Sequence, residues 1–531
     1  MNSYILVTAI VIFMCIALSR ASQKAGLPTL AVFIGLGMLF GEDGLFHIQF
    51  SDYTAVEQIC SISLIFIMFY GGFGTNWKRA RDTALLSGLL SSAGVLLTAA
   101  LTGLFCHFVL GMAWLPALLV GAVISSTDAA SVFSILRSRK LNLRYGTASL
   151  LEVESGSNDP FAYMTTIIVL TLMGGNANGW DMVWMLVRQL LFGAAVGAVV
   201  AWAAKLMLTH FRFTEEGQDS MGIFAAALLS YGLAQVIGGN GYLSVYLTGL
   251  MLGNMPIGNK KALVHFFDGA TGLMQILIFF LLVLLSDPSA LPEVALPALA
   301  IALFLTLVAR PAAVFAIMSP FHCPVKQQLL VSWAGLRGAA SIVFAIMATV
   351  SSVQTPDSLF NTIFFIVLFS IIIQGSLIPL VAKKLDMIDA DGDVMKTFSD
   401  YTEESPVQFL QLRIKEEHPW ADHELRHLRM LPQTRVALII RGKEQIIPRG
   451  RTRILKDDRV IISGPALEGD AWGSLKEINI SRDHDWCGRT LNDIAMANHR
   501  LVVMIRRRNK TIIPTGSTVI RDQDVLVVNE T

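Results

Sequence analysis

The feature that most constrains this chain is a series of apolar runs, each long enough to cross a bilayer, that continues to about residue 383. A membrane span needs about 20 predominantly apolar residues, and about thirteen such runs can be counted. They lie near residues 4–19, 27–41, 55–74, 83–109, 113–136, 146–173, 180–208, 219–238, 242–253, 263–285, 295–318, 327–350 and 358–382. Only 15% of the 531 residues are charged, against about one quarter in soluble proteins. The pattern predicts a mostly α-helical, polytopic membrane protein.

Charges in the loops support this count and predict an orientation. Every second loop is basic, whereas the loops between them carry acids but no Lys or Arg. The basic loops hold Arg20, Lys24, Lys78, Arg79, Arg81, Arg137, Arg139, Lys140, Arg144, Lys205, Arg212, Lys260, Lys261, Lys326, Lys383 and Lys384. Because cytoplasmic loops carry the excess of Lys and Arg, we expect an inner-membrane protein with its N-terminus outside and its C-terminal tail in the cytoplasm.

After residue 385 the composition becomes that of a soluble segment. Residues 386–406 are polar and acidic, which predicts a linker. The remaining residues repeat at a constant offset of 66 without gaps, so that Ile446-Ile447-Pro448 recurs as Ile512-Ile513-Pro514. Ungapped self-similarity indicates duplicated structural units. The predicted domains are a transmembrane domain (1–385), the linker (386–406), a first lobe (407–466) and a second lobe (467–531).

Each lobe is expected to be α+β, with a short helix followed by strands. An apolar strand, Pro-x-Gly-x-Thr, an Asp and a closing apolar strand occur in that order. This pattern resembles the C-terminal lobe of potassium-conductance regulators, the TrkA-C or RCK-C type. The resemblance leaves open a packing or dimerisation module and a site for a regulatory nucleotide such as a cyclic dinucleotide. No resident cofactor is expected, NAD is not implied because the tail lacks a Gly-x-Gly-x-x-Gly after a strand, and the net charge of +1 gives no indication of a nucleic acid partner.

Ionisable side chains inside spans indicate function, because each costs about 2.5–3.5 kcal/mol in the bilayer. The spans hold Asp128, Glu152, Glu154, Asp159, Arg310 and Arg337. Glu152 is as readily an interfacial residue as a functional one. Small and hydroxyl residues crowd the segment 124–131, and the segment 337–341 repeats its Ala-Ala-Ser. Such interruptions are typical of the broken helices of secondary transporters, where opposite charges can neutralise the half-helix ends.

The sixth span combines several oxygen donors near the middle of the membrane. Ser155 and Asp159 are four residues apart and share one helix face, while Glu154 and Asn158 share a neighbouring face. Hydroxyl, amide and carboxylate oxygens suit a dehydrated Na⁺ or K⁺. One carboxylate can hold a proton or a cation but not both well, and this competition is sufficient for exchange.

These motifs closely resemble the NhaP-like, electroneutral branch of the cation:proton antiporters over about residues 1–385. Thr127-Asp128, the segment 154–159 and Gly335-Leu336-Arg337-Gly338 match the family's broken-helix, ion-binding and arginine motifs. The resemblance implies that Asp159 is the principal cation and proton site. It implies that Ser155 and the Thr127 backbone are co-ligands, that Asp128 contributes through water, and that Asn158 beside Asp159 goes with one-for-one exchange.

The resemblance also implies an ion pair between Glu154 and Arg337 that braces the core. The implied fold is a homodimer of inverted-repeat bundles with broken crossing helices, in which a core domain moves in an elevator-type manner against a dimerisation domain. One position departs from the family, because Tyr70 stands where NhaP-like members often have an acid. Fewer charged ligands favour K⁺ slightly over Na⁺. Arg310 and Tyr70 are accessory candidates.

Two other classes of protein fit the sequence less well. A cation channel gated by the tail would need a pore loop or filter ring, and no Thr-Val-Gly-Tyr-Gly-like segment is present. An intramembrane hydrolase would need a nucleophile with a buried base, and no His lies deep in a predicted span. The sequence therefore predicts a transporter, not an enzyme, that exchanges K⁺ or Na⁺ for H⁺.

Overall fold

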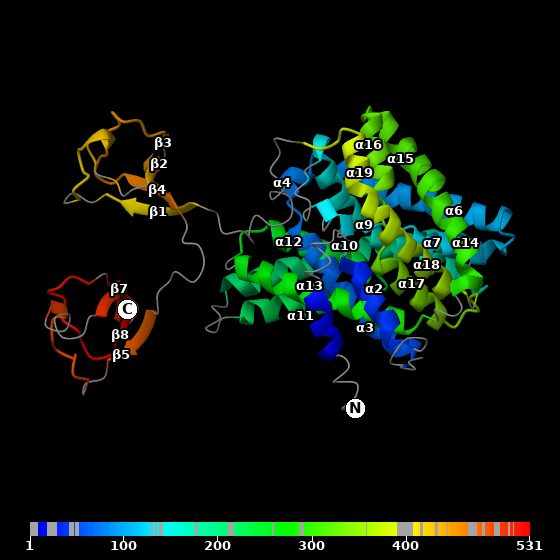
Figure 1. The fold of residues 1–531 in the computed structure, drawn as a ribbon, viewed down its shortest axis with the longest axis horizontal. Helices are drawn as coiled ribbons and strands as arrows, with labels where there is room; N and C mark the ends of the chain where they lie inside the picture. The colour runs from blue at the N-terminus through cyan, green and yellow to red at the C-terminus, as the bar shows by residue number, and fades with distance from the viewer. Residues whose placement is uncertain are drawn as a thin grey trace. The chain divides into compact units, whose positions relative to one another are not determined.

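The structure is a computed structural model that separates into two units, residues 1–402 and residues 403–531 (Figure 1). Its described residues are 9–18, 29–41, 47, 52–128, 131–132, 135–136, 141, 143–175, 179–210, 217–257, 260–286, 291–356, 358–389, 407–414, 418–428, 430, 434–442, 444–465, 475–480, 484–492, 500–507, 510–512 and 514–530. Most of the predicted linker, and loop residues such as Arg20, Arg137 and Arg212, lie outside these ranges.

The first unit is helical, and each predicted span overlaps helical residues. Its helices are Ala9–Leu18, α2 (Thr29–Phe40), α3 (Tyr53–Gly74), α4 (Trp77–Ala80), α5 (Ala84–Leu89), α6 (Val95–Phe108), α7 (Trp114–Ile124), α9 (Thr147–Met173), α10 (Gly179–His210), α11 (Gln218–Val236), α12 (Gly241–Asn254), α13 (Lys260–Leu284), α14 (Leu291–Phe304), α15 (Arg310–Met318), α16 (Val325–Trp333), α17 (Ala339–Val350), α18 (Leu359–Phe369) and α19 (Ser376–Lys384).

Among the described residues, six helical stretches are long and apolar enough to cross a membrane by themselves. Other spans are shorter, such as Ala9–Leu18, or are interrupted, as where α7 and α17 meet non-helical segments. An interrupted span is made of separate helices, each of which is too short to cross a membrane by itself. The multi-pass helical fold is thus confirmed, whereas thirteen crossings and their inverted repeats remain predictions.

The helices pack as two groups that meet at the middle of the unit. In the first group, α3 packs on α12 and α13, and α12 packs on α10 and α11. In the second group, α7 packs on α6 and α9, and α14 packs on α18. Glycine permits close approach within the first group, because a Cβ on Gly253 of α12 would lie 2.1 Å from the Phe73 carbonyl oxygen of α3. The two groups share walls of the cavity described below.

Both predicted interruptions are present in the second group. Helix α7 ends at Ile124 and is followed by non-helical residues through Asp128. Residues 335–338 between α16 and α17 are also non-helical. The two segments are joined by a backbone hydrogen bond of 2.8 Å from the Asp128 N–H to the Leu336 carbonyl. Crowded small residues and glycines are consistent with both breaks, because they weaken helices.

The tail contains two four-stranded antiparallel sheets of the same topology. The strands are β1 (Val407–Arg413), β2 (Arg435–Arg441), β3 (Glu444–Ile446), β4 (Arg459–Pro465), β5 (Leu475–Asn479), β6 (Arg500–Arg507), β7 (Lys510–Ile512) and β8 (Asp524–Glu530). Their orders are β1-β4-β2-β3 and β5-β8-β6-β7. Even the irregularities repeat, since the register shifts at Val436/Leu438 and again at Val502/Met504. The duplication predicted from the 66-residue offset is confirmed. Of the expected short helix, the described part of the first lobe holds a 3₁₀ turn, Leu425–His427.

Each lobe is fastened by an equivalent ion pair. Arg441 donates two hydrogen bonds of 2.8 Å to the buried Asp458, and Arg507 donates two of 2.7 Å to the buried Asp524. Desolvation raises the pKa of Asp458, but the bonds from Arg441 and from the Leu455 N–H outweigh it, so the pKa lies below its ordinary value. The carboxylate is therefore kept charged and holds the strand to its neighbouring turn.

We expect Asp458→Asn to lower the free energy of unfolding of the first lobe by about 2 kcal/mol, because charge-assisted hydrogen bonds are lost. Since folding lowers this pKa, the stabilisation is complete above the unfolded pKa of about 4 and is lost as the pH falls through the folded pKa. Limited proteolysis of the full chain across this pH range measures the effect. Asp457→Asn, at an exposed neighbouring carboxylate, is the control. Identical cleavage of wild type and Asp458→Asn at pH 7 contradicts the role of the pair.

Candidate functional site

Helix α9 places the predicted acidic residues on a face that lines a cavity. Glu152, Ser155 and Asp159 follow one another at three- and four-residue intervals, so they lie along one side of the helix. Gly156 lies between them on the cavity wall. Pro160 has no N–H, so it cannot donate the usual bond to the Gly156 carbonyl one turn earlier. The helix thus brings carboxylate, hydroxyl and carbonyl oxygens to one place.

The non-helical segment after α7 lies against this face. Ser155 Oγ donates to the Thr127 carbonyl at 2.8 Å, and Asn158 Nδ2 donates to Thr127 Oγ1 at 2.5 Å. Ser126 Oγ donates to Asp159 Oδ1. The structure therefore brings Thr127, Ser155, Asn158 and Asp159 together, as the sequence predicted, although their role in ion binding remains a prediction.

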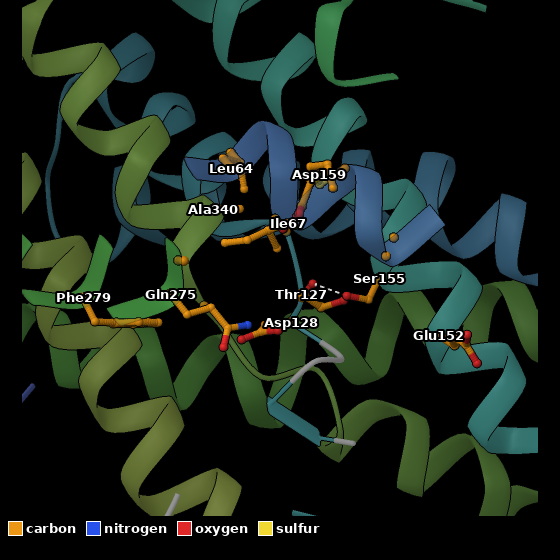
Figure 2. Close-up of a pocket in the computed structure, with 16 residues that line it drawn as sticks. Leu64, Ile67, Thr127, Asp128, Glu152, Ser155, Asp159, Gln275, Phe279 and Ala340 are labelled. Atoms are coloured by element: carbon orange, nitrogen blue, oxygen red, sulfur yellow. Dashed lines mark hydrogen bonds between the residues drawn. The ribbon is translucent and has the colours of Figure 1, made fainter. Parts of the chain in front are cut away.

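The cavity at this junction has a volume of about 90 Å³. The second group supplies its polar wall from α9 and from the two non-helical segments, which include Asp128 and Gly338. The first group supplies a largely apolar wall from α3 and α13, in which Gln275 is polar. Figure 2 shows the Thr127–Ser155 hydrogen bond beside Asp128 and Gln275, with Glu152 farther along α9. The site thus lies where the two helix groups meet.

Asp128 acts on the helix that follows it as well as facing the cavity. Its Oδ2 accepts from Ser131 Oγ at 2.5 Å, and its Oδ1 accepts from the Ser131 N–H at 3.3 Å. A Cβ on Gly338 would lie 2.5 Å from Asp128 Oδ2, so only glycine leaves room for the carboxylate there. This places a negative charge near the N-terminus of α17, which carries a partial positive charge. Whether Asp128 reaches a cation through water is untested.

Arg337 satisfies the broken backbone. Its Nη1 donates to the carbonyls of Ser125 and Ser126, each at 2.7 Å, directly beyond the C-terminus of α7. Its own N–H donates to Ser370 Oγ at 3.0 Å. A positive charge at a helix C-terminus is favourable, and carbonyls buried without donors would be costly. Arg337 therefore holds the two interruptions together.

The predicted ion pair between Glu154 and Arg337 is corrected by the structure. Glu154 pairs with Arg310 instead, with a distance of 2.5 Å between Glu154 Oε1 and Arg310 Nη2. The side chains of Glu154 and Arg310 are 1% and 3% exposed, so the pair is fully desolvated. In the structure Arg337 directs Nη1 to the Ser125 and Ser126 carbonyls, whereas Arg310 Nη2 reaches the Glu154 carboxylate. Arg310, considered only an accessory candidate, follows a π-helical turn at Leu305–Ala309, a feature often found at functional sites.

Tyr70, the other accessory candidate, does not line the cavity; its neighbours Met68 and Gly71 do. The Tyr70 hydroxyl donates to Asp268 Oδ1 of α13 at 3.1 Å. The carboxylate that α3 lacks at this position is therefore supplied nearby by Asp268 of α13. Whether either residue affects ion choice remains a prediction.

Sequence reasoning did not single out two polar residues that line the cavity, Ser126 and Gln275. Ser126 donates to Asp159, and its signal was its place among the small and hydroxyl residues of the interruption. Gln275 comes from α13, and an isolated amide in an apolar helix gives no pattern to find. Within the described residues, no cluster of three His, Cys, Asp or Glu side chains has the geometry of a metal site. The oxygen donors present are those that bind alkali cations, which would be the transported cargo.

Comparison with known proteins gives the same assignment for both parts of the chain. The transmembrane sodium/hydrogen exchanger family matches residues 9–384, and the TrkA-C domain matches residues 409–466 and 475–528. A K⁺/H⁺ antiporter NhaP from Alkalimonas amylolytica is 34% identical over 87% of this chain and 81% of its own length. A K⁺/H⁺ antiporter NhaP2 from Shewanella baltica is 32% identical over 89% of this chain and 83% of its own.

A more distant relative and a solved structure are also similar to this chain. The low-affinity Na⁺/H⁺ antiporter NhaS1 from Synechocystis is 25% identical over 69% of this chain and 71% of its own length. The sodium proton antiporter MjNhaP1 from Methanocaldococcus jannaschii superimposes with a TM-score of 0.64, at 24% identity, over 72% of this chain and 98% of its own. These relatives are transporters, in agreement with the prediction that the chain is not an enzyme.

The Glu154–Arg310 pair predicts a coupled loss of stability. Glu154→Gln or Arg310→Gln should each cost about 3–5 kcal/mol, because the partner is left as an unpaired buried charge. The double variant should recover part of that loss, measured as thermal unfolding in detergent. Glu154→Gln combined with Arg337→Gln is the comparison, and it should recover less, because Arg337 donates to the Ser125 and Ser126 carbonyls rather than to Glu154. Recovery in the Arg337 combination, and not in the Arg310 combination, contradicts the pairing seen here.

Proposed function

Because this chain belongs to the sodium/hydrogen exchanger family, we propose that it exchanges K⁺ for H⁺ across the cell membrane, with Na⁺ as the alternative cation. The observation that carries the proposal is the meeting of Asp159, Ser155 and Thr127 at two interrupted helices. Carboxylate, hydroxyl and backbone carbonyl oxygens replace the water around a dehydrated alkali cation. Asp159 holds either the cation or the proton, so each excludes the other.

The number of charged groups supports electroneutral exchange of K⁺. Asn158, whose amide donates to Thr127 Oγ1, stands where a second acid would add a charge. One carboxylate that exchanges one cation for one proton moves no net charge. The acid nearest Tyr70 is engaged with its hydroxyl and lies outside the residues that line the cavity. A cavity that has no carboxylate from α3 among its lining residues suits the larger and more weakly hydrated K⁺, and the NhaP and NhaP2 relatives carry K⁺/H⁺ in their names.

Alternating access follows from the position of the cavity between the two helix groups. In the proposed elevator-type mechanism the second group, which carries Asp159, slides against the first. The two interruptions would be the equivalent elements of inverted repeats. The protein would act as a homodimer with its N-terminus outside. Exposed apolar residues of α10, such as Trp184, Leu191 and Trp202, suit contact with lipid.

The tail is proposed to regulate transport from the cytoplasm. Two lobes of one topology would form a pseudo-symmetric groove for a small symmetric ligand, such as a cyclic dinucleotide. A ligand that binds the tail more tightly in one transport state shifts activity by that difference in affinity. The alternative function, a tail-gated cation channel, is not favoured, because the named relatives are antiporters.

We expect Asp159→Asn to abolish cation-driven proton movement in proteoliposomes while the purified protein stays folded. Wild type should exchange K⁺ and Na⁺ at different rates, and its rate should not change when the membrane potential is clamped at different values. Asp181→Asn, an exposed acid in the first turn of α10, is the matched control and should exchange normally. Wild-type exchange in Asp159→Asn sinks the site assignment, and a steep voltage dependence sinks the stoichiometry.

Deleting residues 407–531 should leave exchange intact but remove its dependence on a cytoplasmic effector. The measurement is exchange in vesicles loaded with cyclic dinucleotides, together with the thermal shift of the full chain on adding them. Mononucleotides serve as the control ligand. If no nucleotide shifts unfolding and the truncated protein keeps the wild-type pH dependence, the tail is a structural module instead.

A further inference from the structure

The cavity is asymmetric about Asp159. Helix α9 contributes Glu152, Ser155, Gly156 and Asp159 to its wall, and none of the residues that line it follows Asp159 on this helix. Because α9 begins after a basic loop, the orientation predicted from the loop charges places these residues on the cytoplasmic side. Helix α3 runs in the opposite direction and contributes Leu64, Ile67, Met68 and Gly71, again from its cytoplasmic half. Along α9 and α3 the lining residues therefore lie on the cytoplasmic side of Asp159, whereas Gln275 and Phe279 line the cavity from the outer half of α13.

Aromatic rings from both helix groups pack on the other side of Asp159. Tyr163 follows Asp159 by one helical turn, a rise of about 6 Å. Its ring lies 5.0 Å from that of Tyr242 of α12 and 5.9 Å from that of Phe344 of α17. Tyr231 of α11 extends the cluster, 5.1 Å from Tyr242. Tyr163 and Phe344 belong to the second group, whereas Tyr242 and Tyr231 belong to the first.

Two hydrogen bonds cross the boundary between the groups at this level. Gln235 Nε2 of α11 donates to the Tyr163 hydroxyl at 3.2 Å. Asn240, the N-cap residue of α12, donates to the Pro160 carbonyl at 3.0 Å. Gln235 Nε2 also lies 3.2 Å from the Tyr231 hydroxyl, but that contact stays within α11. Any sliding of α9 past α11 and α12 must break the first two bonds and can leave the third intact.

We propose that Tyr163 and Gln235 form the outer gate of the exchange passage, in which their hydrogen bond and the surrounding rings close the path from Asp159 to the outside. Both are positioning residues, because they hold the two helix groups in the cytoplasm-facing state and do not bind the cation. The proposal rests on the proposed exchange function and on the predicted orientation. It adds the element that separates the two access states.

The test compares two variants, each of which removes one tyrosine hydroxyl that accepts a hydrogen bond from Gln235. Tyr163→Phe keeps the ring and loses the bond between the groups, whereas Tyr231→Phe loses the bond within α11. One net hydrogen bond corresponds to about a fivefold change in an equilibrium, and an affinity falls in proportion to the fraction of competent protein. Tyr163→Phe should lower the half-saturating K⁺ concentration at the outer face by up to about fivefold and raise it at the inner face. Tyr231→Phe should leave both faces unchanged.

A second readout does not require transport. Leu64→Cys places a thiol on the cavity wall, and a membrane-impermeant thiol reagent is applied from the outside. Labelling should be several times faster when Tyr163→Phe is also present. Gln235→Met should act like Tyr163→Phe, and combining the two should add nothing further. Unchanged labelling, an equal change in Tyr231→Phe, or a shift confined to the inner face overturns the gate. If the wild-type protein shows no exchange, only the proposed function is contradicted, because labelling of Leu64→Cys reports the gate without transport.

Discussion

The rest of the transport unit depends on one constraint, which is that two helices are interrupted inside an apolar environment. Each break leaves backbone carbonyls and N–H groups that water cannot satisfy there. Arg337 meets much of this demand by donating to the Ser125 and Ser126 carbonyls while its own N–H is held by Ser370. Ser370 in turn donates to Gln374, which donates to the Trp333 carbonyl at the end of α16. A polar network thus replaces the missing helical turns and keeps the cavity oxygens fixed.

The same network explains how the charged side chains are arranged around the two interruptions. Arg337 offsets the negative end of α7, and Asp128 lies against the positive end of α17. Arg310 is then the cation that remains for Glu154. Asp159, which accepts from Ser126, is left to face the cavity. The site therefore separates carboxylates that hold the protein together from Asp159, the carboxylate proposed to exchange a cation for a proton.

The sequence was sufficient wherever function follows from local pattern. Hydropathy and loop charges predicted the helical unit, and the 66-residue offset predicted two equivalent sheets. The spacing of Ser155 and Asp159 predicted a shared face, because helical periodicity fixes it. The predicted partner of Glu154 was wrong. Two arginines on successive spans are equivalent in sequence, and only packing decides which of them reaches the Glu154 carboxylate. Gln275 and the Gln235–Tyr163 bond were missed for the same reason, since neither leaves a periodic signal.

The π-helical turns at Leu90–Gly94, Leu305–Ala309 and Ser370–Gly375 have an evolutionary consequence. A π turn holds one residue more than an α-helix of equal rise, so it absorbs an insertion without rotating the residues on either side. Homologous transporters that lack one of these turns should therefore differ from this chain by a single-residue gap at that place, within a span where gaps are otherwise rare. Insertions and deletions, more than substitutions, would then identify the members of the family that lack one of these π-helical turns.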